Sequence, residues 1–262
     1  MKFVIQFNLI NEEQPLKIRD VVEKYSYEYV SVIPFTHEIR PNNPPLDGVD
    51  YIPYGSTLLC TLADELKWKG CYFDLETFNY EAFIKNRDDM LNSNIYTITE
   101  ALEFLKTQPK DQMWFTRPSK DLKQYTGLTN PTHSCIEYFT NALLADTSSV
   151  AQLKPDTKIV LCETKNIDAE YRWFVVGRKV ISGSLYRHSG MLFKERVTDK
   201  KIIDEAQTFA DKWLPHENCV MDLALVDGEM KVIEFNCLNG SGFYDNDVAA
   251  IFDALWKYEE AR

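Results

Sequence analysis

The chain has 262 residues, of which 45% are hydrophobic and 26% are charged, and its formal net charge is −11. This length and composition fit a globular protein with one large or two small domains, and they exclude an intrinsically disordered chain. The negative charge argues against a nucleic-acid surface, which needs clustered cations. No apolar run approaches the ~18 residues of a membrane span, so we expect neither a membrane nor a nucleic acid as a partner.

The N-terminal sequence MKFVIQFNLI and the six cysteines indicate the compartment. The N-terminus lacks a small-residue cleavage site and is typical of a first strand rather than a signal peptide. The cysteines form no C-x-x-C pair, which argues against a zinc site and favours free thiols in apolar surroundings. We therefore expect a cytoplasmic protein.

The first part of the chain alternates strand-like and helix-like segments. Strands are predicted at residues 2–10, 30–35 and 49–56, and helices at residues 18–25 and 56–70. Ser56 or Thr57 caps the second helix, and Gly70 ends it. Such alternation predicts an N-terminal α/β domain over residues 1–90 with a small, mainly parallel sheet.

The second part, residues 91–262, predicts an α+β domain with an antiparallel sheet. Thr97 and Glu100 form a capping box before a helix. Strands are predicted at residues 113–118 and 158–163, and a strand–turn–strand at 171–187. Helices with one apolar face are predicted at residues 199–213 and 247–258.

A hairpin within residues 217–247 carries three oxygen-bearing side chains. Its turn is predicted at Asp227-Gly228, which places Asp222 nearly opposite Glu234. Glu234 and Asn236 are two residues apart, so their side chains share one face. Two carboxylates and an amide oxygen form the hard-oxygen site that suits Mg²⁺ bound together with phosphate oxygens.

The strand–turn–strand AEYRWFVVGRKVISGSLYR carries Glu170, Arg172 and Arg187. Guanidinium groups on paired strands suit phosphate oxygens, because arginine is always charged and binds phosphate bidentately. The alternative interpretation is an exposed row of arginines on a sheet.

Together these features resemble the ATP-grasp superfamily. The hairpin resembles its metal-binding hairpin, an Asp followed by Glu-x-Asn, and the arginine-bearing strands resemble those of ribosomal-protein glutamate ligases. Strand 158–163, which ends in Cys162-Glu163, resembles the linker that packs against adenine. The resemblance implies an α/β pre-ATP-grasp domain over 1–90 and an antiparallel-sheet ATP-grasp nucleotide-binding domain over 91–262.

The segment WFTRPSKDLKQYTG, residues 114–127, departs from the common ATP-grasp pattern. Arg117 stands where these proteins usually carry a phosphate-binding lysine, and the following loop is poor in glycine. The segment resembles an arginine-using clade that includes the eukaryotic assembly factor for translation initiation factor 2. Lys123 in the loop is a second candidate phosphate contact, and the alternative is a solvated lysine.

The resemblance also implies the cofactors and the residues that bind them. ATP and Mg²⁺ are the expected cofactors, with Asp222, Glu234 and Asn236 as metal ligands and Arg172 and Arg187 as catalytic residues. The residues implied in nucleotide binding are Arg117, Lys123, Cys162, Glu163, Arg172, Asp222, Glu234 and Asn236.

The resemblance leaves the reaction open between different classes of function. The first is a ligase that joins a carboxylate to an amine through an acyl phosphate, with small-molecule, peptide or protein substrates. The alternative is an ATP-binding assembly module that clasps a partner protein without ligation, and phosphotransfer to a hydroxyl is a third. Tyr244 and Asp245, after a loop with two glycines, are candidate substrate contacts; Asp245 or Asp247 is equally an N-cap of the last helix.

Overall fold

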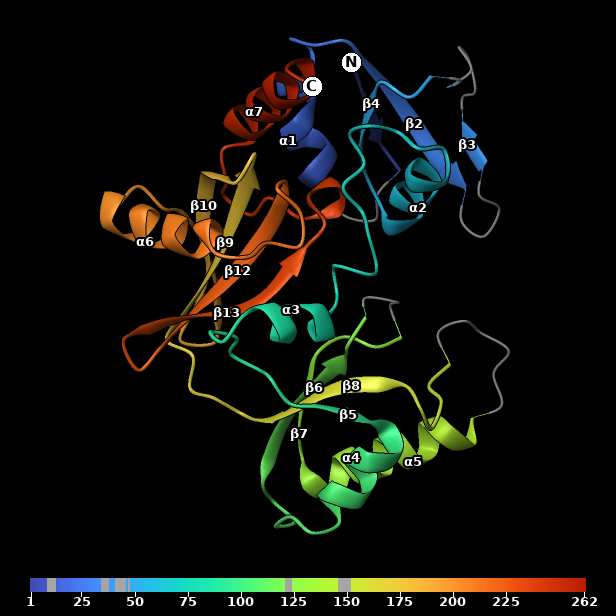
Figure 1. Cartoon of the computed structure of the whole chain (residues 1–262), viewed down its shortest axis with the longest axis vertical. Coiled ribbons are helices and arrows are strands. Elements are labelled where there is room, and N and C mark those ends of the chain that lie inside the picture. The colour runs from blue at the N-terminus through green and yellow to red at the C-terminus, as the bar shows by residue number, and fades with distance from the viewer. Residues whose placement is uncertain (9–12, 34–37, 41–45, 47, 121–123, 146–151) are drawn as a thin grey trace. The chain divides into compact units, whose positions relative to one another are not determined.

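The computed structural model describes residues 1–8, 13–33, 38–40, 46, 48–120, 124–145 and 152–262 (Figure 1). Contacts between Cα atoms divide the chain into two compact units, each built from separate stretches of sequence. Unit 1 comprises Met1–Asp74, Ala169–Leu223 and Phe235–Arg262, and unit 2 comprises Leu75–Asp168 and Ala224–Glu234. No helix of the described residues has both the length and the apolar character that a membrane span needs.

Unit 1 begins with a four-stranded sheet in the order β3-β2-β1-β4. Its elements are β1 (Lys2–Gln6), α1 (Glu13–Val22), β2 (Tyr27–Ile33), β3 (Glu38–Arg40), β4 (Tyr51–Tyr54) and α2 (Thr57–Glu65). β1 pairs in parallel with β2 and β4, and only β3 runs antiparallel to its neighbour. The mainly parallel sheet predicted for this part of the chain is confirmed.

Helix α2 begins where the sequence predicts and ends earlier. The Ser56 side chain accepts a hydrogen bond from the backbone N–H of Leu59, so Ser56 is the N-cap. The helix stops at Glu65 rather than at Gly70, because Lys67 adopts a left-handed backbone conformation with φ of 56°.

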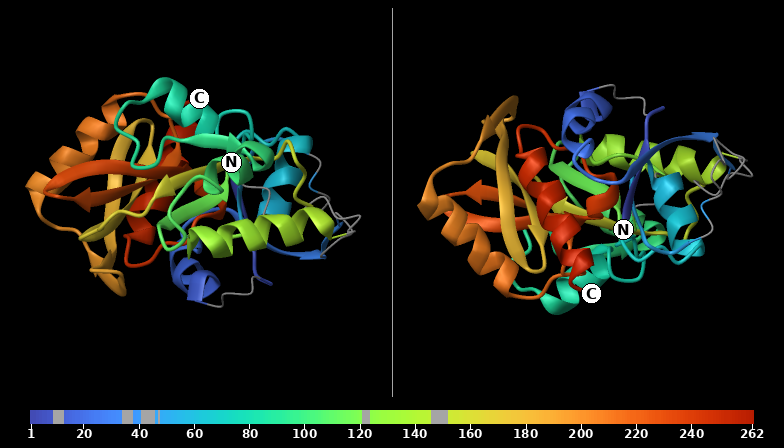
Figure 2. Two further views of the ribbon diagram at one scale, coloured as in Figure 1. Left: turned by 90° about the horizontal axis from the view of Figure 1, so that it is seen from below. Right: turned by 90° about the horizontal axis from the view of Figure 1, so that it is seen from above.

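A five-stranded sheet has the order β11-β10-β9-β12-β13, and its residues outside Ala224–Glu234 belong to unit 1. Its elements are β9 (Ala169–Val176), β10 (Lys179–His188), β11 (Met191–Arg196), α6 (Lys200–Asp211), β12 (Cys219–Val226), β13 (Glu229–Asn236), the 3₁₀ turn η1 (Leu238–Gly240) and α7 (Val248–Glu260). Helix α6 packs against β10, and α7 packs beside α1 and against β9 and β10 (Figure 2).

One hydrophobic cluster joins the two sheets of unit 1. Phe3 and Ile5 from β1, Phe174 from β9, and Ile251 and Phe252 from α7 are among its buried members. A second cluster lies between the first sheet and α2. The first cluster includes Phe174 of β9 and Val220 of β12, so its packing fixes the strands that carry Arg172 and Asp222.

The β12–β13 hairpin is confirmed, and its turn is made by Asp227 and Gly228, with φ of 53° and 80°. Both residues adopt positive φ, which is typical of a two-residue hairpin turn. Along β13 the buried side chains are Met230, Val232 and then Phe235, so the alternation skips one residue. After this irregularity, Glu234 and Asn236 lie on either side of buried Phe235 in the strand.

Unit 2 is built on an antiparallel sheet in the order β5-β8-β6-β7, as predicted for this part of the chain. Its elements are α3 (Tyr80–Asn86), β5 (Ile95–Thr97), α4 (Ile98–Leu105), β6 (Met113–Pro118), β7 (Leu128–Pro131), α5 (Thr132–Leu144) and β8 (Lys158–Glu163). The predicted capping box is present, with Thr97 bonded to the backbone N–H of Glu100 and Glu100 bonded back to Thr97.

Candidate functional site

Arg172 and Asp222 form a bidentate ion pair in unit 1. Arg172 projects from β9 and Asp222 from β12; Nε donates to Oδ1 at 2.9 Å and Nη2 donates to Oδ2 at 2.7 Å. The Asp222 side chain is 1% exposed and that of Arg172 is 13% exposed. Two parallel hydrogen bonds between charged groups fix the guanidinium plane as well as its position.

The pair also sets the protonation of Arg172. Burial by itself lowers the pKa of Arg172, but the charge of Asp222 and its hydrogen bonds raise that pKa above the ordinary value for an arginine. Arg172 is therefore a permanent cation that can neutralise negative charge on a bound ligand.

Asn236, a predicted metal ligand, lies next to Asp222. The Asn236 amide Nδ2 donates to Asp222 Oδ2 at 3.2 Å, which brings two of the three predicted oxygen donors together within unit 1. Glu234 precedes Asn236 by two residues on β13. Strand alternation gives the two side chains a common face.

Glu234 is engaged in unit 2 by Arg117. Arg117 lies on β6, and its Nη1 donates to Glu234 Oε2; the side chains are 20% and 17% exposed. The guanidinium carbon of Arg117 also lies 5.2 Å from the centre of the Tyr80 ring, within the range of a cation–π contact. Tyr80 in turn donates from its hydroxyl to the Ile233 carbonyl at 2.9 Å.

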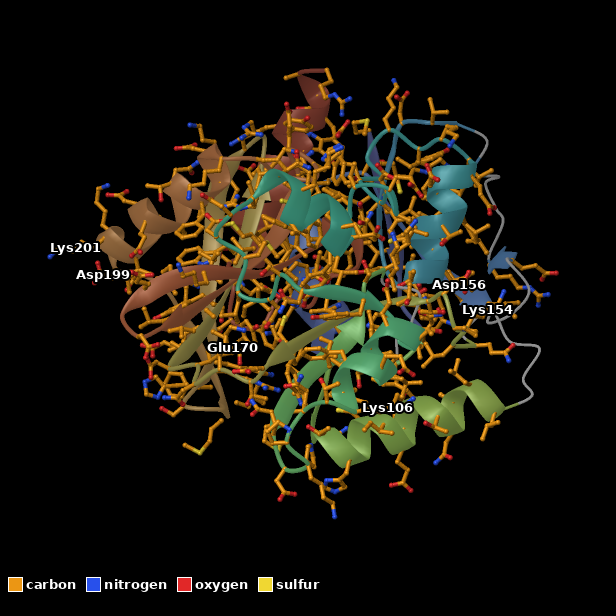
Figure 3. All side chains as sticks on the ribbon, turned by 60° about the horizontal axis from the view of Figure 1, so that its bottom comes forward. Lys106, Lys154, Asp156, Glu170, Asp199 and Lys201 are labelled. Atoms are coloured by element: carbon orange, nitrogen blue, oxygen red, sulfur yellow. The ribbon has the colours of Figure 1, made fainter. Side chains whose placement is uncertain are left out.

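Arg187 and Glu170 lie at the more exposed end of the β9–β10 pair; Glu170 is labelled in Figure 3. They stand opposite each other in the strand register, and Arg187 Nη1 is 3.9 Å from Glu170 Oε1. Ser184 stands opposite Arg172 in the same register. Opposed residues share a face, so Arg172, Glu170 and Arg187 lie on one face of the sheet. Arg187 keeps 53% of its side chain exposed.

The strand predicted to face adenine is β8, and it carries Cys162 and Glu163. Cys162 is buried, whereas Glu163 is exposed at the end of the strand. Lys165 reaches back to the Glu163 carbonyl at 3.3 Å and to Asn92 Oδ1 at 3.2 Å. Lys123, the remaining predicted phosphate contact, lies outside the described residues.

The loop after Asn236 contains Asn239, which has a structural role, and the candidate substrate contacts Tyr244 and Asp245. Asn239 is fully buried, and its amide donates to the Pro53 and Gly70 carbonyls, both at 2.8 Å. The Asp245 carboxylate accepts from the backbone N–H of Arg196 at 3.0 Å. Asp247 caps α7 by accepting from Ala250 N at 3.0 Å, which resolves the choice of N-cap in its favour.

Two residues beside the arginines were not found from the sequence. Tyr186 and Tyr80 each contact a candidate arginine through the ring. Tyr186 adjoins Arg187 in the sequence, and this proximity was the one available signal. Tyr80 lies 37 positions before Arg117 and carries no motif.

The side chains fit the chemistry of Mg²⁺ and a nucleotide. Asp222 and Asn236, which lie together in unit 1, carry carboxylate and amide oxygens, the donors that Mg²⁺ prefers. The described residues contain no group of three or more His, Cys, Asp or Glu arranged to hold a metal.

Comparison with known proteins identifies the fold. The sequence model of the ATP-grasp domain, R2K clade family 2, matches residues 97–254, which is more than half of the chain. None of the curated proteins matches the sequence.

Three solved structures are similar over nearly their whole length. D-cycloserine synthetase DcsG has a TM-score of 0.64 at 10% identity, covering 100% of both chains. A RimK domain ATP-grasp protein from Sphaerobacter thermophilus has a TM-score of 0.63 at 11% identity, and the match covers 98% of this chain and 100% of that protein. D-alanine–D-alanine ligase from Bacillus anthracis has a TM-score of 0.61 at 12% identity, and the match covers 100% of this chain and 98% of the ligase. At these identities the likeness establishes the fold. ATP-grasp ligases use ATP and Mg²⁺, and the chain belongs to the ATP-grasp family, R2K clade family 2.

Proposed function

We propose that the chain is an ATP- and Mg²⁺-dependent ligase that joins a carboxylate to an amine. The observation that carries the proposal is the buried cluster of Arg172, Asp222 and Asn236 in an ATP-grasp chain. It combines a permanent cation with hard-oxygen donors, the two kinds of group that a magnesium–phosphate complex requires.

Asp222, Glu234 and Asn236 are the residues that we propose to hold Mg²⁺, which when bound offsets the charge of the nucleotide phosphates. The assignment of Glu234 rests on its spacing from Asn236 along β13. Arg117, Arg172 and Arg187 bind phosphate oxygens, and Cys162 and Glu163 bind the adenosine part. Lys123 is proposed to contact phosphate on the basis of the sequence alone.

The reaction that we propose starts with a substrate carboxylate, which takes the terminal phosphoryl group of ATP and releases ADP. The acyl phosphate then reacts with an amine, the amide bond forms, and phosphate leaves. A carboxylate and a phosphoryl group repel each other, so cations beside them lower the barrier. Arg172 and Arg187 share one face of β9 and β10 and are the proposed source of this charge. The names of the similar structures support substrates with amino and carboxyl groups, such as amino acids and peptides.

The experiment combines the protein with Mg-ATP and pools of amino acids and peptides, and it follows ADP release and product mass. A ligase gives ADP only with the right pair of substrates, together with a product whose mass equals their sum less one water. Asp222→Asn should abolish both signals. Asp227→Asn, the same change at the tip of the same hairpin, should leave both unchanged.

A second candidate function is ATP-dependent binding of a partner protein without bond formation. Arg117 in place of the usual lysine, paired with Glu234, favours this alternative. ATP binding with no condensation product in any pool, together with a partner that is retained only with ATP, would support it over ligation.

A further inference from the structure

Two stacked tyrosine rings lie beside Arg172, and they come from segments far apart in the sequence. The rings of Tyr186 and Tyr244 are nearly parallel, with centres 4.7 Å apart and an interplanar angle of 8°. The guanidinium carbon of Arg172 lies 5.0 Å from the centre of the Tyr244 ring and 5.7 Å from that of Tyr186. Both distances are within the range of cation–π attraction.

Tyr186 is fixed by an irregularity in β10. The register of β9 and β10 pairs Leu185 with Tyr171 and Arg187 with Glu170, so Tyr186 is the extra residue of a bulge. Bulges re-aim side chains. The Tyr186 hydroxyl donates to Glu170 Oε2 at 2.7 Å, and burial, followed by the charges of Asp222 and Glu170, raises its pKa, so the hydroxyl keeps its proton.

Tyr244 is fixed through its backbone. Its φ is 49°, a left-handed conformation that a bulky residue adopts only where the surrounding structure imposes it. The Lys17 ammonium on α1 donates to the Tyr244 carbonyl. The Arg172 guanidinium also donates to the Gly242 carbonyl, two residues earlier in the same loop, at 3.3 Å.

We propose that Tyr186 and Tyr244 are positioning residues for Arg172, and that Lys17 keeps Tyr244 in place. The ring faces are electron-rich and attract the cation. Asp222 engages Nε and Nη2 of Arg172, and the Gly242 carbonyl accepts from Nη1. The two rings stack on each other, and the attraction of each ring for the guanidinium resists its movement away from the Asp222 carboxylate. The orientation of Arg172 therefore depends on α1, which carries Lys17, as well as on the neighbouring strands β10 and β12.

The test follows the Nε–H proton of Arg172 by NMR in the nucleotide-free protein. Tyr244→Asn removes the ring but keeps a residue that tolerates the left-handed conformation, whereas Tyr244→Phe keeps the ring. With asparagine, exchange of the Arg172 Nε–H with water should accelerate roughly 3- to 30-fold, the range that one cation–π contact accounts for. With phenylalanine it should stay near the wild-type rate.

Lys17 is tested by a second pair of variants that does not alter the rings. Lys17→Met should accelerate exchange of the Arg172 Nε–H with water, as Tyr244→Asn does. Lys17→Arg keeps a cationic donor and should leave the exchange rate near that of the wild type. Unchanged exchange and chemical shift in Tyr244→Asn, in a protein whose remaining amide spectrum is wild type, would overturn the role of the rings. The same result in Lys17→Met would overturn the role of the lysine.

The consequence for nucleotide binding rests on the proposed function and is measured separately. Tyr244→Asn should weaken binding of Mg-ATP by a similar factor, while Tyr244→Phe should not. Altered Arg172 signals with unchanged ATP affinity would uphold the positioning role and contradict the assignment of Arg172 to the phosphates.

Discussion

Single residues in the candidate site are organised as arginine–carboxylate pairs. Asp222 is paired with Arg172 in unit 1, and Glu234 is paired with Arg117 in unit 2. A carboxylate as buried as Asp222 requires a cationic partner, because an isolated charge is strongly disfavoured away from water. The residues proposed to bind a metal therefore also contribute to the stability of the fold.

Removing one partner of the buried pair should destabilise the protein more than removing both. Asp222→Ala leaves Arg172 buried without its counter-charge and should lower the free energy of unfolding by about 3–5 kcal/mol. The double variant Asp222→Leu with Arg172→Met replaces the pair by apolar groups and should lose much less. Urea denaturation of the nucleotide-free protein measures both, and equal losses would contradict the account of this pair.

Arg187 should contribute to the reaction without contributing to stability. Its side chain is half-exposed and its ion pair with Glu170 is long, so Arg187→Met should leave the melting temperature nearly unchanged. If Arg187 stabilises charge in the transition state, kcat should fall by roughly 10³-fold or more. Lys179→Met, at the exposed start of the same strand, is the matched control, and equal kcat in the two variants would exclude the catalytic role.

The sequence supplied the charged residues of the site but not their partners. The predicted turn placed Asp222 opposite Glu234, the two-residue spacing placed Glu234 and Asn236 on one face, and the family resemblance proposed all three as metal ligands. The pairing of Arg172 with Asp222 spans 50 residues and that of Arg117 with Glu234 spans 117, distances over which local patterns carry no information. The ring contacts of Tyr186 and Tyr80 depend on the same long-range packing.

Among the elements, the β9–β10 pair depends on a close contact between a glycine and a tryptophan. Gly183 stands opposite Trp173, and a Cβ at Gly183 would lie 2.1 Å from the indole ring. Trp173 is fully buried, so its ring has little room to move. This contact lies on the two strands that carry Arg172 and Arg187.

Gly183→Ala should therefore destabilise the sheet, by about 1–3 kcal/mol, the usual cost of overfilling a packed core. Because the strands also carry the arginines, the variant should lower ATP affinity as well as the melting temperature. Thermal unfolding and nucleotide titration together measure this, with Lys179→Ala as the control on β10. A variant of wild-type stability would show that the sheet can accommodate the added methyl group.

Elements with local signals were predicted well, and those without were missed. Strands β6 and β8 agree with the predicted ranges, and α4 begins at its predicted capping box. Helix α5 was not anticipated, because Pro131 at its N-cap makes no side-chain hydrogen bond and the helix lacks a sequence start signal. Edge strand β11 is exposed along its whole length and so has no alternation of apolar and polar residues.

The whole molecule is made of two units that each combine distant stretches of sequence. Local sequence patterns carry no information about the grouping of residues 224–234 with residues 75–168. The division of the chain into domains 1–90 and 91–262 stays a prediction. The fold itself was predicted, because the motifs of the hairpin and of the strand pair occur in the order typical of ATP-grasp proteins.

Global stability should depend on pH through His216. Burial lowers the pKa of this histidine, which lies 5.0 Å from Tyr72, ring centre to ring centre, and accepts a hydrogen bond from Asn218 N at 2.9 Å. The unfolded chain then binds a proton at a higher pH than the folded chain does. The free energy of unfolding should therefore fall as the pH drops below about 6.5 towards the lowered folded value. Denaturation between pH 5 and 8, with His216→Gln as comparison, measures this contribution, and an equal slope in both proteins would contradict it.

We propose that the side-chain oxygens of Asp222, Glu234 and Asn236 bind the Mg²⁺ that accompanies ATP. Calorimetric titration with ATP, in the presence and absence of Mg²⁺, tests it most directly in the wild-type protein and in Asp222→Asn, Glu234→Gln and the control Asp227→Asn. We predict that Mg²⁺ strengthens ATP binding in the wild type and the control, and that both site variants lose this gain while remaining folded. Wild-type, Mg²⁺-dependent affinity in Asp222→Asn and Glu234→Gln would contradict the assignment of the site.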